Sequence, residues 1–244
     1  MTVINRESGT SIDEVADGLY RITTPIPPSV FPGGFSFNQY LVLDDEPLLF
    51  HAGPRRTFDL VRQAIAAVVP VERLHWIGFS HVESDECGAL NQLPAAAPHA
   101  LPVCGRVAAM VSMEDLADRT PRALGNGEIL VMGRRTYAWL DAPHLPHGWE
   151  CGFLMERTSG TFLCHAPFTQ PGDRTPALTE ADILSPSEAM RHQMDYFAHG
   201  RDYAALFDHL IAERPTTLAC MHGSAWRGDG AALLAALRDS LAGN

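Results

Sequence analysis

The chain has 244 residues, of which 46% are hydrophobic and 19% are charged, as in a folded globular protein with a sizeable core. Its 18 basic and 29 acidic residues give a formal net charge of -11, which argues against nucleic acid or an anionic membrane surface as a partner. The N-terminal segment is polar, no apolar run is as long as a membrane-spanning helix, and the five cysteines include no CxxC pair. We therefore expect a cytoplasmic protein of one domain, residues 1–244, with reduced thiols and no membrane partner.

The first half of the chain alternates between strand patterns and helix patterns. Phe58, Val61, Ile65 and Val68 recur at helical spacing and predict an amphipathic helix. The elements expected in order are a strand over 18–26, a Pro-rich loop over 25–33, a hairpin of strands over 35–43 and 47–51, a helix over 56–69, a buried strand over 74–79, a helix over 85–97, a strand over 101–104 and a helix over 105–117.

The second half repeats this alternation. We expect hairpins over 128–132 with 135–140 and over 152–156 with 161–165, helices over 179–196 and 201–213, a strand over 217–221, and a last helix that Asp229 caps and that ends near 241. Hairpins and βα units in both halves predict an α/β protein in which two mixed sheets lie face to face with helices outside, a four-layer αββα sandwich. Sites on such a fold lie in the loops at strand ends.

A cluster of ionisable residues follows the strand over 74–79 directly and comprises His81, Glu83, Asp85 and Glu86. Charged groups at the edge of a core are costly unless they are paired or bound to a cation. A helix N-terminus would explain Asp85 and Glu86, but it leaves His81 and Glu83 unexplained. We therefore predict a site for a first-row metal ion, namely iron, manganese or zinc.

Three further histidines stand at the ends of predicted strands or in a stiff loop. His147 lies between a proline and a glycine, His222 follows the last strand, and His165 ends a hairpin. Each of them alone has a plain alternative as a loop histidine or a packed core residue, and for His165 the two alternatives stay open. Cys87 and Cys164 lie beside two of these candidate ligands. Each could be a redox-active thiol or a soft metal ligand, but core packing is the favoured interpretation.

The order of these motifs resembles the metallo-β-lactamase superfamily. The chain has a strand, then His-x-Glu-x-Asp at 81–85, then a histidine in a Pro-containing loop and a histidine at a strand end. Hydrolases of the superfamily usually have HxHxDH and bind zinc, whereas Glu83 at the second position is similar to the HxExDH of the flavodiiron branch, whose members bind two irons. The resemblance runs from Asn38 to Gly223.

The resemblance implies a ligand set with two departures. The residue at the second-metal histidine position is Glu86, whose carboxylate can still ligate. The bridging Asp of the family falls on Ala166, which cannot ligate, and the adjacent His165 replaces it only if the turn is reshaped. By position, the first metal is expected at His81, Glu83 and His147, and the second at Asp85, Glu86 and His222.

Three functions follow from this site. The favoured one is a non-haem iron protein, with two ions or one, that binds or activates dioxygen or a related small oxidant, because neutral histidines with carboxylates suit the Fe(II)/Fe(III) couple. The second is a hydrolase of an ester, lactone or phosphodiester in which Asp85 is catalytic and orients the attacking water. The third is a metal-binding sensor or a degenerate, non-enzymatic member.

The resemblance also implies partners. No flavodoxin-like domain is expected after residue 244, and a reductase would then need a separate electron-donor protein. A small-molecule substrate or dioxygen would enter between the loops 24–34 and 166–178, where Phe31, Phe35 and Phe168 are expected to form an apolar lining. Members of the family often pair head to tail, so a homodimer is expected.

Overall fold

Two mixed β-sheets carry the fold in this computed structural model, which describes residues 1–164, 166–198 and 200–242. In the first sheet, neighbouring strands are antiparallel from β1 to β5 and parallel from β5 to β8. Its strands lie in sequence order: β1 (Thr2–Val3), β2 (Ser11–Ala16), β3 (Leu19–Ile26), β4 (Phe35–Val42), β5 (Leu48–Phe50), β6 (Trp76–Gly78), β7 (Leu101–Gly105) and β8 (Arg122–Leu124).

The second sheet comes from the other half of the chain and has the order β13-β15-β14-β12-β11-β10-β9. Its pairs β12·β14 and β13·β15 are parallel, and the remaining pairs are antiparallel. The strands are β9 (Ile129–Met132), β10 (Arg135–Asp141), β11 (Gly152–Glu156), β12 (Thr161–Leu163), β13 (Leu178–Thr179), β14 (Thr217–Ala219) and β15 (Ala225–Arg227).

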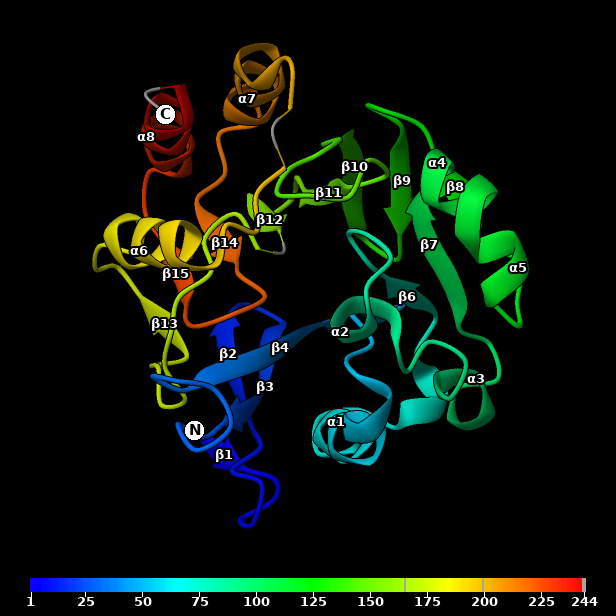
Figure 1. Ribbon diagram of the computed structural model, residues 1–244. Coiled ribbons are helices and arrows are strands. Elements are labelled where there is room, and N and C mark those ends of the chain that lie inside the picture. Colours follow the sequence, from blue (N-terminus) through cyan, green and yellow to red (C-terminus); the bar gives the residue numbers. More distant parts are fainter. Residues whose placement is uncertain (165, 199, 243–244) are drawn as a thin grey trace.

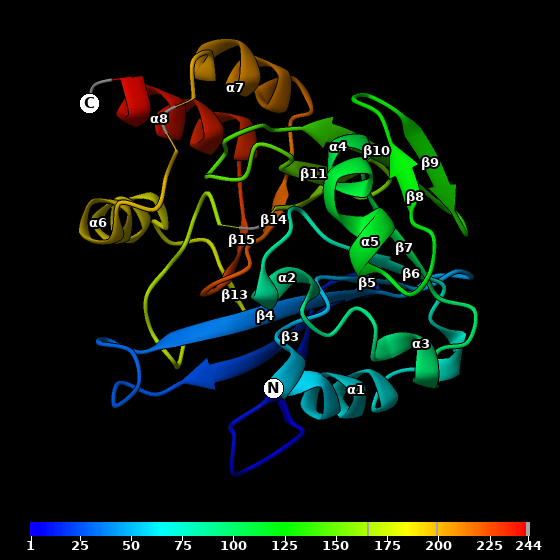
Figure 2. The same ribbon diagram turned by 45° about the vertical axis from the view of Figure 1, so that its right-hand side comes forward.

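Helices cover the outer faces of both sheets (Figures 1 and 2). The first half of the chain provides η1 (Arg55–Thr57), α1 (Phe58–Ala66), η2 (Val71–Arg73), α2 (Ser84–Cys87), α3 (Leu93–Ala96), α4 (Arg106–Ala108), a π-helical turn over Ala109–Met113 and α5 (Glu114–Leu116). The second half provides α6 (Leu184–Met194), α7 (Tyr203–Ala212) and α8 (Gly230–Ala242). Figure 2 shows α1 below the first sheet, whereas α7 and α8 lie above the second.

Side-chain alternation along the strands builds the layers. In β4, Tyr40 joins a cluster between the two sheets, whereas its neighbour Leu41 packs under α1. In β11, Leu154 faces the same inter-sheet cluster, whereas Phe153 packs toward α7 and α8. This period of two is what a strand with both faces buried requires. The predicted four-layer αββα sandwich is therefore confirmed.

Several element boundaries differ from the prediction. The continuous helix expected over 85–97 is two short turns, α2 and α3, because Pro94 has no N–H to continue the ladder and Gly88 packs tightly. A Cβ at Gly88 would lie 2.3 Å from Ser84 O and 3.0 Å from Arg55 N. The strands β1, β2, β8, β13 and β15 were not predicted, and α6 begins at Leu184 rather than near 179, where β13 ends. Along the described part of the chain, no helix combines the length and the apolar character needed to cross a membrane.

Candidate metal centre

The loop that follows β6 is held by the loop that follows β5. His51 N donates to Gly78 O at 2.8 Å, Ala52 N donates to Glu86 O at 2.6 Å, and Ala89 N donates to Gly53 O at 2.9 Å. The chain after β5 is therefore bonded to the end of β6, to Glu86 at the end of the acidic turn and to Ala89 just beyond it. This pairing fixes where the side chains of the His-x-Glu-x-Asp segment point.

His81, Glu83 and His147 converge on one point. Glu83 Oε2 lies 2.9 Å from His81 Nε2 and 3.0 Å from His147 Nε2, and the two Nε2 atoms are 3.0 Å apart. Three atoms in such a triangle cannot all be joined by near-linear hydrogen bonds. Ligand atoms are about 3.0 Å apart when metal bonds of about 2.1 Å meet at right angles. The three residues therefore fit a cation at their centre.

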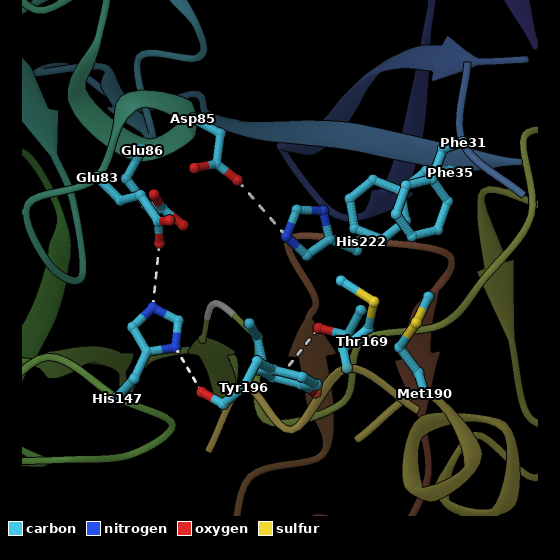
Figure 3. A pocket seen from close by; sticks show the side chains of 12 residues that line it. Phe31, Phe35, Glu83, Asp85, Glu86, His147, Thr169, Met190, Tyr196 and His222 are labelled. Carbon is cyan, nitrogen blue, oxygen red and sulfur yellow. Dashed lines mark hydrogen bonds and ion pairs between the residues drawn. The ribbon is translucent and has the colours of Figure 1, made fainter. Parts of the chain in front are cut away.

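The tautomer of His147 also suits a metal ligand. Its Nδ1–H donates to Tyr196 O at 3.0 Å, so the neutral ring carries a lone pair on Nε2, and this lone pair faces Glu83 (Figure 3). When no cation is bound and His147 is protonated, its Nε2–H donates to Glu83, and this hydrogen bond is the main cause that holds the pKa of Glu83 well below its usual value. The same hydrogen bond raises the pKa of His147. Glu83 is therefore ionised, as a ligand must be.

A second acidic group adjoins the first. One oxygen from each of Glu83, Asp85 and Glu86 can be chosen so that all lie within 4.8 Å of one another. Glu86 is 1% exposed, and burial, followed by the charge of Asp85, raises its pKa well above the usual range. His222 Nε2 lies 3.6 Å from Asp85 Oδ2 (Figure 3). Asp85, Glu86 and His222 thus surround a second, looser position for a cation.

The loop that carries His222 is anchored on β4, across from its own sheet. His222 Nδ1 donates to Ser36 O at 2.8 Å, and Gly223 N donates to Ser36 Oγ at 2.9 Å. Asn38 Nδ2 donates to Cys220 O at 2.9 Å and to Gly223 O at 2.7 Å. These bonds leave His222 Nε2 facing Asp85 and bring the ends of the two sheets together.

The structure thus groups six of the seven predicted site residues, and the seventh, His165, lies outside the described residues. Ala166 is 6% exposed and lines the cavity beside the site, as expected for the position of the missing bridging Asp. Its methyl group offers no ligand atom. The carboxylate that joins two ions in flavodiiron proteins, as the sequence resemblance implies, therefore has no counterpart at this position.

A cavity of about 250 Å³ opens over the two groups (Figure 3). Phe31 and Phe35 line it as expected, but Phe168 is fully buried in the core beneath the second sheet, so its predicted place in the lining was wrong. The wall also has residues that the sequence did not single out. These are Thr169, Met190, Met194 and Tyr196.

His51 is a residue whose role the sequence interpretation missed. It is fully buried with a left-handed backbone (φ 69°), and its Nε2 lies 3.1 Å from Ser80 Oγ, which in turn lies 3.2 Å from His81 Nδ1. Burial, followed by the charges of His81 and His222, lowers its pKa well below the usual value. The sequence shows that His51 follows a buried strand, but its contact with Ser80 is visible only in the folded chain.

The thiols beside the site are packed rather than reactive. Burial raises the pKa of Cys87 to about 12, with Glu86 as a smaller cause. Cys164 is fully buried, and burial is also the main cause that raises its pKa well above the usual value. Thiolates are the reactive form of cysteine, so these environments favour the core-packing interpretation for both residues.

Solved structures of other proteins share the fold of this chain over nearly its whole length. The rubredoxin oxygen:oxidoreductase of Desulfovibrio gigas matches with a TM-score of 0.81 and 18% identity over 95% of this chain and 62% of that one. The metal-soaked Flv1 flavodiiron core from Synechocystis matches with a TM-score of 0.79 and 17% identity over 95% of this chain and 60% of that one. The Giardia intestinalis flavodiiron protein matches with a TM-score of 0.76 and 20% identity over 95% of this chain and 59% of that one.

The chain thus spans less than two thirds of the length of these structures. No protein-family model matches it, and no curated protein does so either. At these identities the likeness concerns the fold, and it covers nearly all of this chain. The chain therefore has the fold of the metallo-β-lactamase-like domain of flavodiiron proteins.

Proposed function

We propose that this protein holds iron at His81, Glu83 and His147 and binds or activates dioxygen or a related small oxidant there. The observation that carries the proposal is the convergence of Glu83 Oε2 with two imidazole Nε2 atoms at 2.9 and 3.0 Å. Two histidines and one carboxylate with open positions are the ligand set of non-haem Fe(II) sites that react with oxygen. Flavodiiron proteins and a rubredoxin oxygen:oxidoreductase, which share the fold, support the choice of metal and oxidant.

When bound, the iron would supply redox chemistry and a vacant coordination position for the oxidant. The chain's own residues provide the surroundings. Tyr196 O fixes the ring of His147 through Nδ1, and aromatic and thioether side chains line the open side of the cavity with apolar surface. Asp85 Oδ2 lies 3.6 Å from His222 Nε2 at the edge of the cavity, so these two atoms would hold the second ion beside the first.

We propose unequal occupancy of the two positions. The ligand atoms of the first converge within hydrogen-bonding distance, whereas Asp85 and His222 at the second are 3.6 Å apart and lack a bridging carboxylate at Ala166. A shared carboxylate offsets the charge of two ions and holds them together, so its loss weakens the second ion more than the first. One tightly held ion is the expected state. A reductive reaction would draw its electrons from a separate donor protein.

A metal-dependent hydrolase is the second candidate, because two histidines and a glutamate are also the ligand set of catalytic zinc sites. In that case Asp85, at the edge of the cavity, would orient the attacking water or act as its base. The substrate would be an ester, lactone or phosphodiester. The two candidates share their ligands and differ in the metal.

Metal analysis of protein purified from iron-supplied cells tests the proposal. We expect about one iron per chain, with an absorption spectrum that changes when the reduced protein meets air. Zinc alone in such protein, together with turnover of generic ester, lactone or phosphodiester substrates, would support the hydrolase instead. Protein without any first-row metal would contradict both candidates.

A further inference from the structure

We propose that the cavity over the candidate metal centre binds a small organic molecule with an apolar body and a single oxygen-donor group at one end. The inference rests on the proposed function, because the donor group would bind the metal at His81, Glu83 and His147. It goes beyond that function because it names the shape and chemistry of an organic ligand that would bind beside the oxidant.

The size of the cavity is the first reason. Its volume is about 250 Å³. A water molecule occupies about 30 Å³ in the liquid, so the cavity has room for about eight such volumes, far more than a diatomic oxidant needs. Part of this space lies beside Ala166, where a carboxylate at the bridging position would project. Compared with an aspartate, the alanine at position 166 thus lacks a ligand atom and also leaves more space in the cavity.

The chemistry of the wall is the second reason. Phe31 and Phe35 lie with ring centroids 5.0 Å apart, and the ring of Phe35 is tilted by 31° over that of His222 at 4.3 Å. Met190 and Met194 of α6 line the same space, and Figure 3 shows Met190 beside Thr169. Aromatic rings and flexible thioethers together form a surface that adapts to an apolar ligand.

The wall's hydroxyl groups are already engaged by the protein. Tyr196 OH donates to Ala166 O at 3.0 Å, and Thr169 Oγ donates to the same carbonyl at 3.0 Å. Both residues therefore present mainly carbon to the cavity. Polar recognition is confined to the end formed by the carboxylates and histidines, so the ligand needs one polar end and an apolar remainder.

The partly exposed walls make the proposal testable without disturbing the core. Phe31 is half-buried in a loop, and Met194 is 51% exposed. Substituting either with serine removes apolar surface from the cavity and leaves every candidate metal ligand in place. Met110, which is 64% exposed on the π-helical turn, offers a matched control for Met194.

The experiment measures binding of a hydroxamate series, from acetohydroxamate through butanohydroxamate to hexanohydroxamate, to protein loaded with whichever of Fe(II), Mn(II) or Zn(II) it retains. Isothermal titration gives the affinity, and metal analysis after desalting shows that the ion stays bound. We expect the affinity to rise about three- to fourfold for each added methylene, as for transfer of a CH₂ group out of water. Acetohydroxamate should bind the wild type, Phe31→Ser and Met194→Ser alike, whereas the gain per methylene should shrink in both variants and persist in Met110→Ser.

Equal affinity along the whole series in metal-loaded protein would overturn this inference and leave the proposed function standing. An unchanged chain-length dependence in both Phe31→Ser and Met194→Ser would overturn it as well, because the apolar body would then lie elsewhere. Protein that retains none of the three metals would overturn the proposed function and this inference with it. The two failures are therefore distinguished by the metal content of the protein used.

Discussion

The Nε2 atoms of His81 and His147 lie 3.0 Å apart, although 66 positions separate the two residues in the chain. His81 follows β6 of the first sheet, and His147 lies in the loop between β10 and β11 of the second. Two imidazoles from different sheets, with a carboxylate oxygen between them, form an arrangement that a cation stabilises. The predictions below test this arrangement and the residues that support it.

Replacing the carboxylate of Glu83 should cost metal affinity without unfolding the protein. Glu83→Gln keeps the size of the side chain but removes the charge that both histidines face, so we expect the affinity to fall by about 100-fold or more. A competition titration with a chelator measures it. Glu114→Gln makes the same change on an exposed helix and should leave the affinity unaltered. Similar affinities for both variants would remove Glu83 from the ligand set.

Restoring a carboxylate at Ala166 should strengthen the second position. Ala166 lines the cavity together with Asp85, Glu86 and His222. In Ala166→Asp we expect the metal content to rise from about one ion per chain toward two, because a bridging carboxylate offsets the charge of both ions. Quantitative metal analysis gives the stoichiometry. Ala232→Asp, on the exposed face of α8, is the control, and an unchanged stoichiometry at 166 would place the bridge position elsewhere.

His51 should support the centre through Ser80, although it does not face the cavity. His51→Asn removes the contact between His51 Nε2 and Ser80 Oγ, while asparagine tolerates the left-handed backbone at φ 69°. We expect metal affinity to fall about 10-fold, within the range for residues that orient a ligand. His192→Asn on the exposed side of α6 is the matched control. An unchanged chelator titration would mean that Ser80 orients His81 alone.

Gly223 should be the least replaceable glycine of the site. It has φ 82°, and a Cβ there would lie 2.5 Å from Gln170 Cβ, so Gly223→Ala combines backbone strain with a clash. We expect the free energy of unfolding to fall by about 2 kcal/mol or more, and the affinity of the second metal position to fall because His222 shifts. Gly127 shares the positive φ, 72°, but a Cβ there would meet nothing within 4 Å. Gly127→Ala should therefore lower the free energy of unfolding by about 1–2 kcal/mol, the cost of the left-handed backbone alone. Urea unfolding of the metal-free proteins compares the two.

The sequence predicted the layers and the grouping of the site because both depend on local patterns. Strand alternation and strand-end histidines are readable along the chain, and His81, Glu83 and His147 indeed meet. His51 could not be assigned because its partner, Ser80, is 29 positions away and becomes its neighbour only when β5 and β6 pair. Phe168 was misplaced for a similar reason: an aromatic residue in a loop reads as a pocket wall until the packing shows it in the core.

The short strands β8 and β15 were missed because three residues cannot display a period of two. They exist because a neighbouring strand offers unpaired backbone groups, which is a property of the assembled sheet. The prediction of one helix over 85–97 was wrong for the opposite reason. The composition of this segment favours a helix, but Pro94 has no N–H to continue the hydrogen bonds of a helix from α2 into α3.

The anchoring of the His222 loop on Ser36 and Asn38 has a mechanical consequence. The loop between β14 and β15 of the second sheet is tied to β4 of the first. An ion shared by loops from both sheets would act as a cross-link between them. Loading the protein with metal should then make the two halves of the sandwich open as one cooperative unit, and amide hydrogens near β4 and β14 should exchange together and more slowly.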